Sequence, residues 1–176
     1  MKEQQLPLPG FEEAAHAKKE IYIMDTSSII SIKEKFSQED QRRIFQKLGQ
    51  FALQGTIKCP PQVLMELKSY EGPEDEPLKW IKNFKSELIV NDPSLYEKAK
   101  EILKRFPSLV DPRKSREQAD PYVIALAEIL REKSNKVIIV SEDIRSRKKK
   151  ISIHDVCRNL NIPCIQIEEF LSKIES

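Results

Sequence analysis

The chain of 176 residues is the length of one domain and can bury a hydrophobic core without disulfide bonds as supports. Charged residues make up 33% and apolar residues 39%, as in ordinary globular proteins, and no apolar run approaches the roughly 20 residues that cross a bilayer. The net charge of +2 excludes a protein that attracts nucleic acid through its overall charge alone.

The N-terminal segment and the cysteines predict a cytoplasmic protein without a membrane partner. The start, "MKEQQLPLPGFEEAAHAKKE", lacks the apolar stretch and cleavage site of a secretory signal. Cys59, Cys157 and Cys164 are odd in number and form no CxxC pair, which argues against a disulfide framework. His154 and Cys157 have H-x-x-C spacing, but a structural zinc site needs four N or S ligands, so we expect the cysteines to be core residues.

The first half of the chain predicts a tail followed by alternating strands and helices. Residues 1–19 contain prolines and few branched apolar residues and read as a tail, and residues 20–176 as a single domain. "IYIMD" (21–25) is apolar without alternation, as in a strand that is covered on both faces. "SQEDQRRIFQKLGQFALQG" (37–55) predicts a helix with Ser37 as its cap, "TIKCP" a second strand, and "PPQVLMELKSY" a helix that a proline opens.

The second half repeats this alternation. Helices are expected at "LKWIKNFKSE" and "SLYEKAKEILKRF", and at "ADPYVIALAEILREK" with Asp120 as the N-cap and Pro121 at the first helical position. "KVIIVSED" predicts a strand that ends in acid, followed by a helix at "HDVCRNLN", a strand at "IPCIQI" and a helix at "EEFLSKI". These elements predict a three-layer α/β/α domain with a central, mainly parallel sheet, whose functional crevice lies at the carboxyl ends of the strands.

Four acids stand where the secondary structure alone does not require them: Asp25, Glu66, Asp120 and Asp143. Three have a structural alternative, since Asp120 fits a helix N-cap, Glu66 fits an outward-facing helix position and Asp143 fits a turn, whereas Asp25 is the hardest to explain in this way. Together they fit a group of carboxylates at the strand ends, which needs a cation to offset its charge. Ligands that offer only oxygen favour Mg²⁺ or Mn²⁺, ions that activate water for phosphodiester hydrolysis.

Two basic runs flank these acids, "DPRKSREQ" (111–118) and "RSRKKK" (145–150). Either run alone is explained as a solvated loop. Beside an acidic centre they would contact the backbone of a nucleic acid. The candidate RNA-binding residues are Arg113, Lys114, Arg116, Arg145, Arg147 and Lys148.

Four stretches in order resemble the motifs of the PIN-domain ribonuclease superfamily, especially the toxin nucleases of toxin–antitoxin pairs. These stretches are "YIMDTSSII", "PPQVLMEL", "QADPYVIALA" and "VIIVSEDIR", within a match from about residue 21 to residue 171. The third is the most specific of the four. The segment from Tyr70 to Phe106 is longer and more charged than in a minimal toxin of this kind.

The resemblance implies a PIN-like fold and an endoribonuclease that uses Mg²⁺ or Mn²⁺. Carried over by position, Asp25, Glu66, Asp120 and Asp143 would be metal-binding and catalytic, with Ser27 and Ser141 supporting them through hydrogen bonds. Glu142 is an alternative to Asp143 as the fourth acid. A toxin would also imply an RNA substrate, a cognate antitoxin protein and a possible homodimer.

Two other functions remain open from the sequence. A catalytically silent PIN-like module that binds RNA or protein would use the same fold without cutting. A phosphatase with Asp25 as nucleophile would also explain the acid at the strand end, but Ser27 stands where a second Asp is needed.

Overall fold

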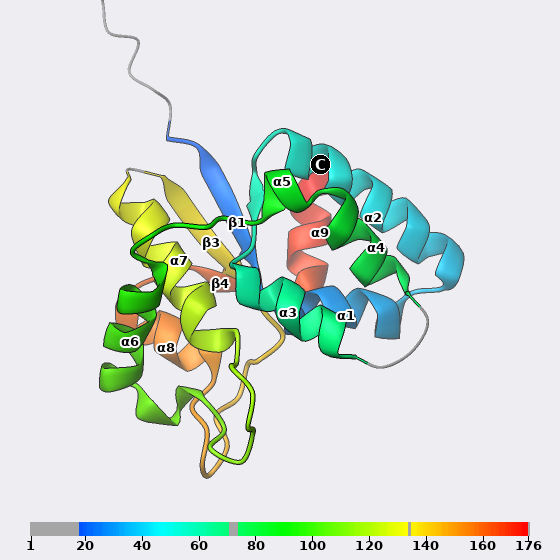
Figure 1. Ribbon diagram of the computed structural model, residues 1–176. Helices are drawn as coiled ribbons and strands as arrows, with labels where there is room; N and C mark the ends of the chain where they lie inside the picture. Colours follow the sequence, from blue (N-terminus) through cyan, green and yellow to red (C-terminus); the bar gives the residue numbers. More distant parts are fainter. Residues whose placement is uncertain (1–17, 71–73, 134, 176) are drawn as a thin grey trace, which may run out of the picture.

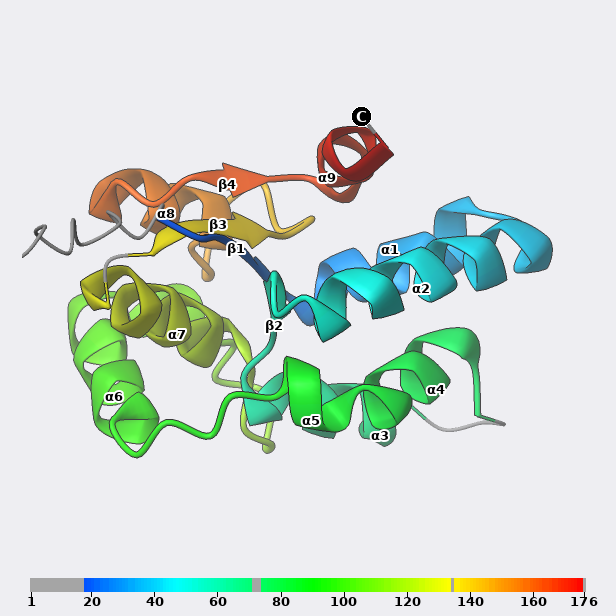
Figure 2. The same cartoon turned by 90° about the horizontal axis from the view of Figure 1, so that it is seen from above.

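A four-stranded parallel sheet with helices on both faces forms the centre of the protein, as the sequence predicts (Figures 1 and 2). The computed structural model describes residues 18–70, 74–133 and 135–175, so that most of the expected tail, residues 1–17, lies outside the described residues. In chain order the elements are β1 (Glu20–Met24), α1 (Thr26–Lys35), α2 (Gln38–Leu53), β2 (Ile57–Lys58), α3 (Pro61–Ser69), α4 (Glu76–Asn83), α5 (Lys85–Leu88), α6 (Leu95–Arg105), η1 (Pro107–Leu109), α7 (Asp120–Glu132), β3 (Lys136–Val140), α8 (Ile153–Leu160), β4 (Cys164–Ile165) and α9 (Ile167–Glu175).

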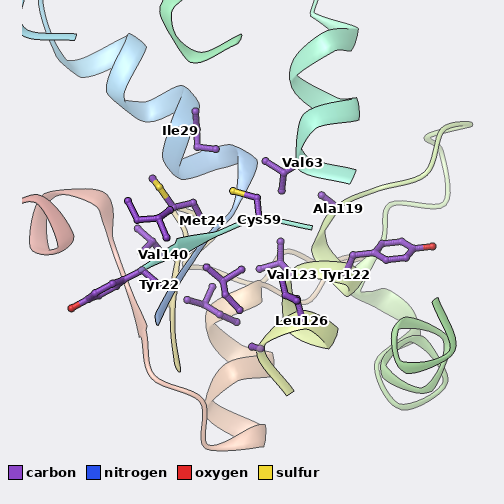
Figure 3. Packing of buried hydrophobic residues seen from close by; sticks show 14 of the residues in the cluster. Tyr22, Met24, Ile29, Cys59, Val63, Ala119, Tyr122, Val123, Leu126 and Val140 are labelled. Atoms are coloured by element: carbon purple, nitrogen blue, oxygen red, sulfur yellow. The ribbon is translucent and has the colours of Figure 1, made fainter. Parts of the chain in front are cut away.

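The strand order is β2-β1-β3-β4, which places β1 and β3 in the middle of the sheet. Both are apolar along their length because helices cover both faces, and Ile23, Met24, Ile139 and Val140 have no exposed surface. Helix α8 packs on α7 and helix α9 packs on α1, and Figure 2 shows α6, α7 and α8 on one side of these strands and α1, α2 and α9 on the other. Side chains from β1, β3, α3 and α7 gather in one hydrophobic core (Figure 3).

The connections agree with the local sequence. Ser37 caps α2 by accepting a hydrogen bond from Asp40 N, and Gly55 follows the helix with a φ of 70°, in the left-handed region that favours glycine. The three cysteines are free; Cys59 and Cys157 are buried and Cys164 is partly buried. None of the helices within the described ranges is both long and apolar enough to cross a membrane.

Three local predictions were incomplete or wrong. Residues 26–35 form helix α1, which the sequence did not predict because Thr26 and its serine and isoleucine neighbours are weak helix formers. The expected helix at 78–87 is divided at Phe84 into α4 and α5. Asp120 is not the N-cap of α7: Ala119 holds that position, and the Asp120 carboxylate pairs with Lys150 instead.

Candidate active site

The register of β1 and β3 brings two residues of the candidate site together. Met24 pairs with Val140, so the next residues, Asp25 and Ser141, leave the sheet side by side. The Asp25 N–H donates to Val140 O at 3.0 Å, which continues the ladder by one bond. Because both strands run parallel, their carboxyl ends meet at the same edge of the sheet.

Two serine hydroxyls donate hydrogen bonds to the same oxygen of the Asp25 carboxylate. Ser27 Oγ donates to Oδ2 at 2.6 Å and Ser141 Oγ donates to it at 2.9 Å. The same hydroxyls accept hydrogen bonds from the loop that follows β3, Ser27 from Glu142 N and Ser141 from Asp143 N. The pair of serines therefore fixes both the carboxylate and the backbone that carries the fourth acid.

Helices α3 and α7 bring in the second and third acids. Glu66 faces the sheet edge rather than solvent, and its Oε1 accepts from Ala119 N at 2.9 Å, at the start of α7. This bond satisfies one of the free N–H groups at that helix terminus. Asp120, in the next position, lies in the first turn of α7, where the helix dipole favours a negative charge.

Glu142 and Asp143, which the sequence could not tell apart, have different roles. Glu142 Oε1 accepts from Ile167 N at 2.7 Å, at the start of α9, and its Oε2 accepts from Gln166 Nε2 at 3.2 Å. Asp143 turns toward Asp120, and the two carboxylates share the ammonium of Lys150. Both side chains reach the same cavity, but only Asp143 shares a partner with another acid of the set.

Asp25, Glu66, Asp120 and Asp143 line one cavity of about 320 Å³, here called the acid pocket. Asp25 has only 3% of its surface exposed. Each of the four carboxylates uses one oxygen in the contacts above. Within the described residues, the other oxygen of each, Asp25 Oδ1, Glu66 Oε2, Asp120 Oδ1 and Asp143 Oδ1, makes no hydrogen bond or ion pair.

The charges in the acid pocket are only partly compensated. Burial, with the nearby Asp120 and Glu66 carboxylates, raises the pKa of Asp25 to about 7, although the two serine hydroxyls act in the opposite direction. Burial also raises the pKa of Asp120, against the effect of Lys150. The neighbouring carboxylates act on Asp25 in the same direction as burial, so a further cation in the acid pocket would favour its ionised form.

Lys150 is the cation that contacts the acids. Its Nζ lies 2.7 Å from Asp120 Oδ2 and 2.9 Å from Asp143 Oδ2. Burial disfavours the charge on Lys150, but the two carboxylates outweigh it and raise the pKa of the amine. Lys150 belongs to the basic run 145–150 and was not expected in the site, because nothing in the local sequence shows that the chain turns back toward Asp120.

The four carboxylates are suitable ligands for a hard divalent ion, because they converge and each has one oxygen that makes no hydrogen bond or ion pair within the described residues. It is not a preformed chelate: in the part of the chain that the structure describes, no three His, Cys, Asp or Glu side chains are arranged to hold a metal ion. A metal bound in the acid pocket would therefore require the carboxylates to draw together around it. His154, which the sequence considered for zinc, has its Nε2 2.8 Å from Ser141 O.

The two basic runs form neighbouring loops at the bottom of Figure 1, and just outside the runs Ile151 N donates to Ser108 O at 3.0 Å. Lys114 and Arg147 reach the acid pocket, together with the exposed ring of Tyr70, which the sequence did not single out. The other expected RNA-binding residues do not line it. Arg113 pairs with Asp111, Arg116 bonds to Ser69 Oγ, and Arg145 and Lys148 are exposed.

A comparison with protein families bears on this geometry. The model of a domain of unknown function, DUF4411, matches residues 22–176. The chain belongs to the DUF4411 family. The match begins in β1 and includes every residue of the acid pocket described above. A comparison with curated proteins found no match. Membership of DUF4411 carries no activity with it, and the chemistry has to be argued from the site.

Proposed function

We propose that this DUF4411 protein is a PIN-like endoribonuclease of the cytoplasm that cleaves RNA phosphodiester bonds with Mg²⁺ or Mn²⁺. The observation that carries the proposal is the convergence of Asp25, Glu66, Asp120 and Asp143 on one pocket at the carboxyl edge of a parallel sheet. The sequence resemblance to PIN-domain nucleases, with four motifs in order, supports the same assignment of these acids.

In this proposal Asp25 and Asp120 would hold the ion, with Glu66 and Asp143 completing the oxygen set. A bound divalent ion would lower the pKa of water and offset the charge that develops on the phosphate. Ser27 and Ser141 would orient Asp25 toward the ion through its Oδ2, and leave Oδ1 free. Lys114 and Arg147, at the rim of the acid pocket, would bind the phosphates of the RNA.

A binding module without cleavage is the second candidate, and one observation favours it. Lys150 already lies between Asp120 and Asp143, where it neutralises part of the acid set without a metal. In this second candidate the acid pocket contributes to the fold or to binding rather than to catalysis.

Cleavage of a labelled RNA tests the proposal. We expect cleavage by the wild type with Mn²⁺ or Mg²⁺, none in EDTA, and a loss of about 100-fold or more in Asp25→Asn. The matched control is Asp40→Asn, which changes a half-exposed carboxylate on α2 outside the acid pocket and should cleave as the wild type does. Equal cleavage by the wild type and Asp25→Asn would remove the acid pocket from the reaction.

Calorimetric titration with Mn²⁺ separates the two candidates. Binding that Asp25→Asn or Asp120→Asn weakens supports the nuclease, whereas no binding at millimolar Mn²⁺ favours the binding module. The toxin role and a cognate antitoxin are proposed from the resemblance alone. An adjacent gene for a small protein that inhibits cleavage would support both. A homodimer is also proposed from the resemblance, and sedimentation analysis tests it.

A further inference from the structure

Two cavities continue the acid pocket along the side of the molecule; together they are called the side groove. The nearer cavity, of about 340 Å³, shares Asp111 and Lys114 with the acid pocket. The farther one, of about 440 Å³, shares Tyr96, Glu117 and Tyr122 with the nearer. The three cavities therefore adjoin one another from the acids to the start of α3.

Tyr96 lies where the two cavities of the side groove meet. Its side chain is 58% exposed although it is a large aromatic ring, and it lines both cavities. Lys100 Nζ lies 5.3 Å from the centre of the ring, and the same ammonium pairs with Glu97 Oε2 at 3.4 Å on the exposed surface of α6. An exposed aromatic ring with a neighbouring cation is the arrangement on which nucleobases stack in proteins that bind single strands.

The charges of the nearer cavity are complementary to a phosphate backbone. Its acids already have partners: Asp111 pairs with Arg113, and Glu117 accepts a hydrogen bond from Tyr122 OH. The Lys114 ammonium, by contrast, makes no ion pair or hydrogen bond within the described residues; only the backbone N–H of Lys114 donates, to Asp111 O. Arg116 bonds only to the neutral Ser69 hydroxyl there. The cations are thus free to bind an anion at the junction with the acid pocket.

The farther cavity offers polar groups that suit the edge of a base. Gln62 lines it from the first turn of α3, one helical turn before Glu66 of the acid pocket. The Gln62 amide makes no hydrogen bond within the described residues, and its Oε1 is buried without a partner. Asn91 lies in the same lining and adds a second amide.

From these observations we infer that the side groove binds an unpaired nucleotide segment next to the phosphate in the acid pocket, with Tyr96 stacking on a base and Lys114 and Arg116 contacting the backbone. The substrate class is therefore single-stranded nucleic acid, because bases that are paired in a duplex are not free to stack on a protein ring. The inference rests on the proposed nuclease function for its biological meaning, but binding can be measured without cleavage.

The experiment is fluorescence anisotropy in EDTA with a short fluorescein-labelled single-stranded RNA. We expect Tyr96→Ala to weaken binding by about 5- to 150-fold, which is the range for one base stacked on an aromatic ring. Tyr96→Phe, which keeps the ring, should bind like the wild type. Lys114→Gln should weaken binding and lower the slope of log Kd against log salt by about 0.7, the value for one phosphate contact on a single strand.

Two control variants and a duplex complete the design. Lys104→Gln removes an exposed lysine of α6 that lines neither cavity, and Leu53→Ala removes an exposed apolar side chain of α2. Both should bind as the wild type does, and a duplex RNA of the same length should bind more weakly, with no dependence on Tyr96. Far-ultraviolet circular dichroism establishes that each variant is folded.

The result that overturns the inference is unchanged binding by Tyr96→Ala, absence of binding by the wild type, or equal binding of single strand and duplex. Unchanged RNA binding by Tyr96→Ala would favour a protein segment as the occupant of the side groove. The two proposals fail separately. RNA that binds through Tyr96 but is never cleaved with Mn²⁺ defeats the nuclease alone, and cleavage that is indifferent to Tyr96 defeats the side groove alone.

Discussion

Lys150 Nζ lies 2.7 Å from Asp120 Oδ2, so the third acid of the pocket already has a cationic partner within the chain. The same ammonium reaches Asp143, 2.9 Å away. An ion that enters the acid pocket would therefore compete with a side chain for two of the four carboxylates.

Replacing Lys150 by Gln should tighten Mn²⁺ binding and destabilise the protein without metal. The amide no longer competes as a cation, but the acids lose their only ion-pair partner among the described residues. We expect the free energy of unfolding in EDTA to fall by about 1–2 kcal/mol, less than for a fully buried pair, because 24% of the Lys150 side chain is exposed.

Thermal melting in EDTA and in Mn²⁺, together with calorimetry, measures both effects of Lys150→Gln. The matched control is Lys149→Gln, the exposed neighbour, which should change neither. Weaker Mn²⁺ binding by Lys150→Gln than by the wild type would show that Lys150 supports the metal site instead of competing with it.

The raised pKa of Asp25 predicts how stability depends on pH in the absence of metal. The carboxyl has a pKa of about 7 in the folded protein and an ordinary value near 3.8 in the unfolded chain, so the folded state binds the extra proton between these values. Stability should therefore fall as pH rises from about 4 to 7 and level off above 7. Asp25→Asn cannot ionise and should lack this decline.

Melting temperatures in EDTA across pH 5 to 8 measure this dependence. The difference between Asp25→Asn and the wild type should shift in favour of the variant as pH rises, because only the wild type must bury an anion. A difference that stays constant with pH would mean that the pKa of Asp25 is close to its ordinary value in the folded protein.

Glu142 and Asp143 should respond oppositely to substitution. Glu142→Ala removes the acceptor for Ile167 N at the start of α9, so we expect a loss of about 1 kcal/mol in stability with cleavage retained. Asp143→Asn should lower RNA cleavage and Mn²⁺ affinity by about 10- to 100-fold. Urea denaturation and the cleavage assay measure these effects in the two variants. Loss of Mn²⁺ binding in Glu142→Ala but not in Asp143→Asn would assign the metal-binding role to Glu142 instead of Asp143.

Gly49 of α2 allows a close approach that a methyl group would block. A Cβ at this position would clash with Phe84 Cζ, so Gly49→Ala should destabilise the protein by about 1 kcal/mol, although alanine is the better helix former. In a Phe84→Ala background the clash is absent and Gly49→Ala should become stabilising by a similar amount. Urea denaturation of the wild type, the two single variants and the double variant measures these changes in the free energy of unfolding. If Gly49→Ala changes stability with the same sign in both backgrounds, the Phe84 ring moves aside freely.

The parallel sheet and the position of its acids could be predicted because they depend on local patterns. Apolar runs without alternation predict central strands. Asp25 comes directly after the run that forms β1, and Asp143 comes three residues after the run that forms β3. Parallel strands place those residues at one edge in any register that keeps the hydrophobic residues buried. Helix α1 was missed because its formation depends on contacts with other elements rather than on its weak intrinsic propensity.

The sequence by itself determined the alternation of strands and helices. The order of its motifs also selected the four candidate carboxylates. Only the tertiary structure decided that Glu66 faces the start of α7, that Asp143 rather than Glu142 turns toward Asp120, and that Lys150 pairs with both Asp120 and Asp143. The physical reason is that backbone pattern is set by near neighbours along the chain. The direction of a charged side chain is set by partners that only folding brings within hydrogen-bonding distance.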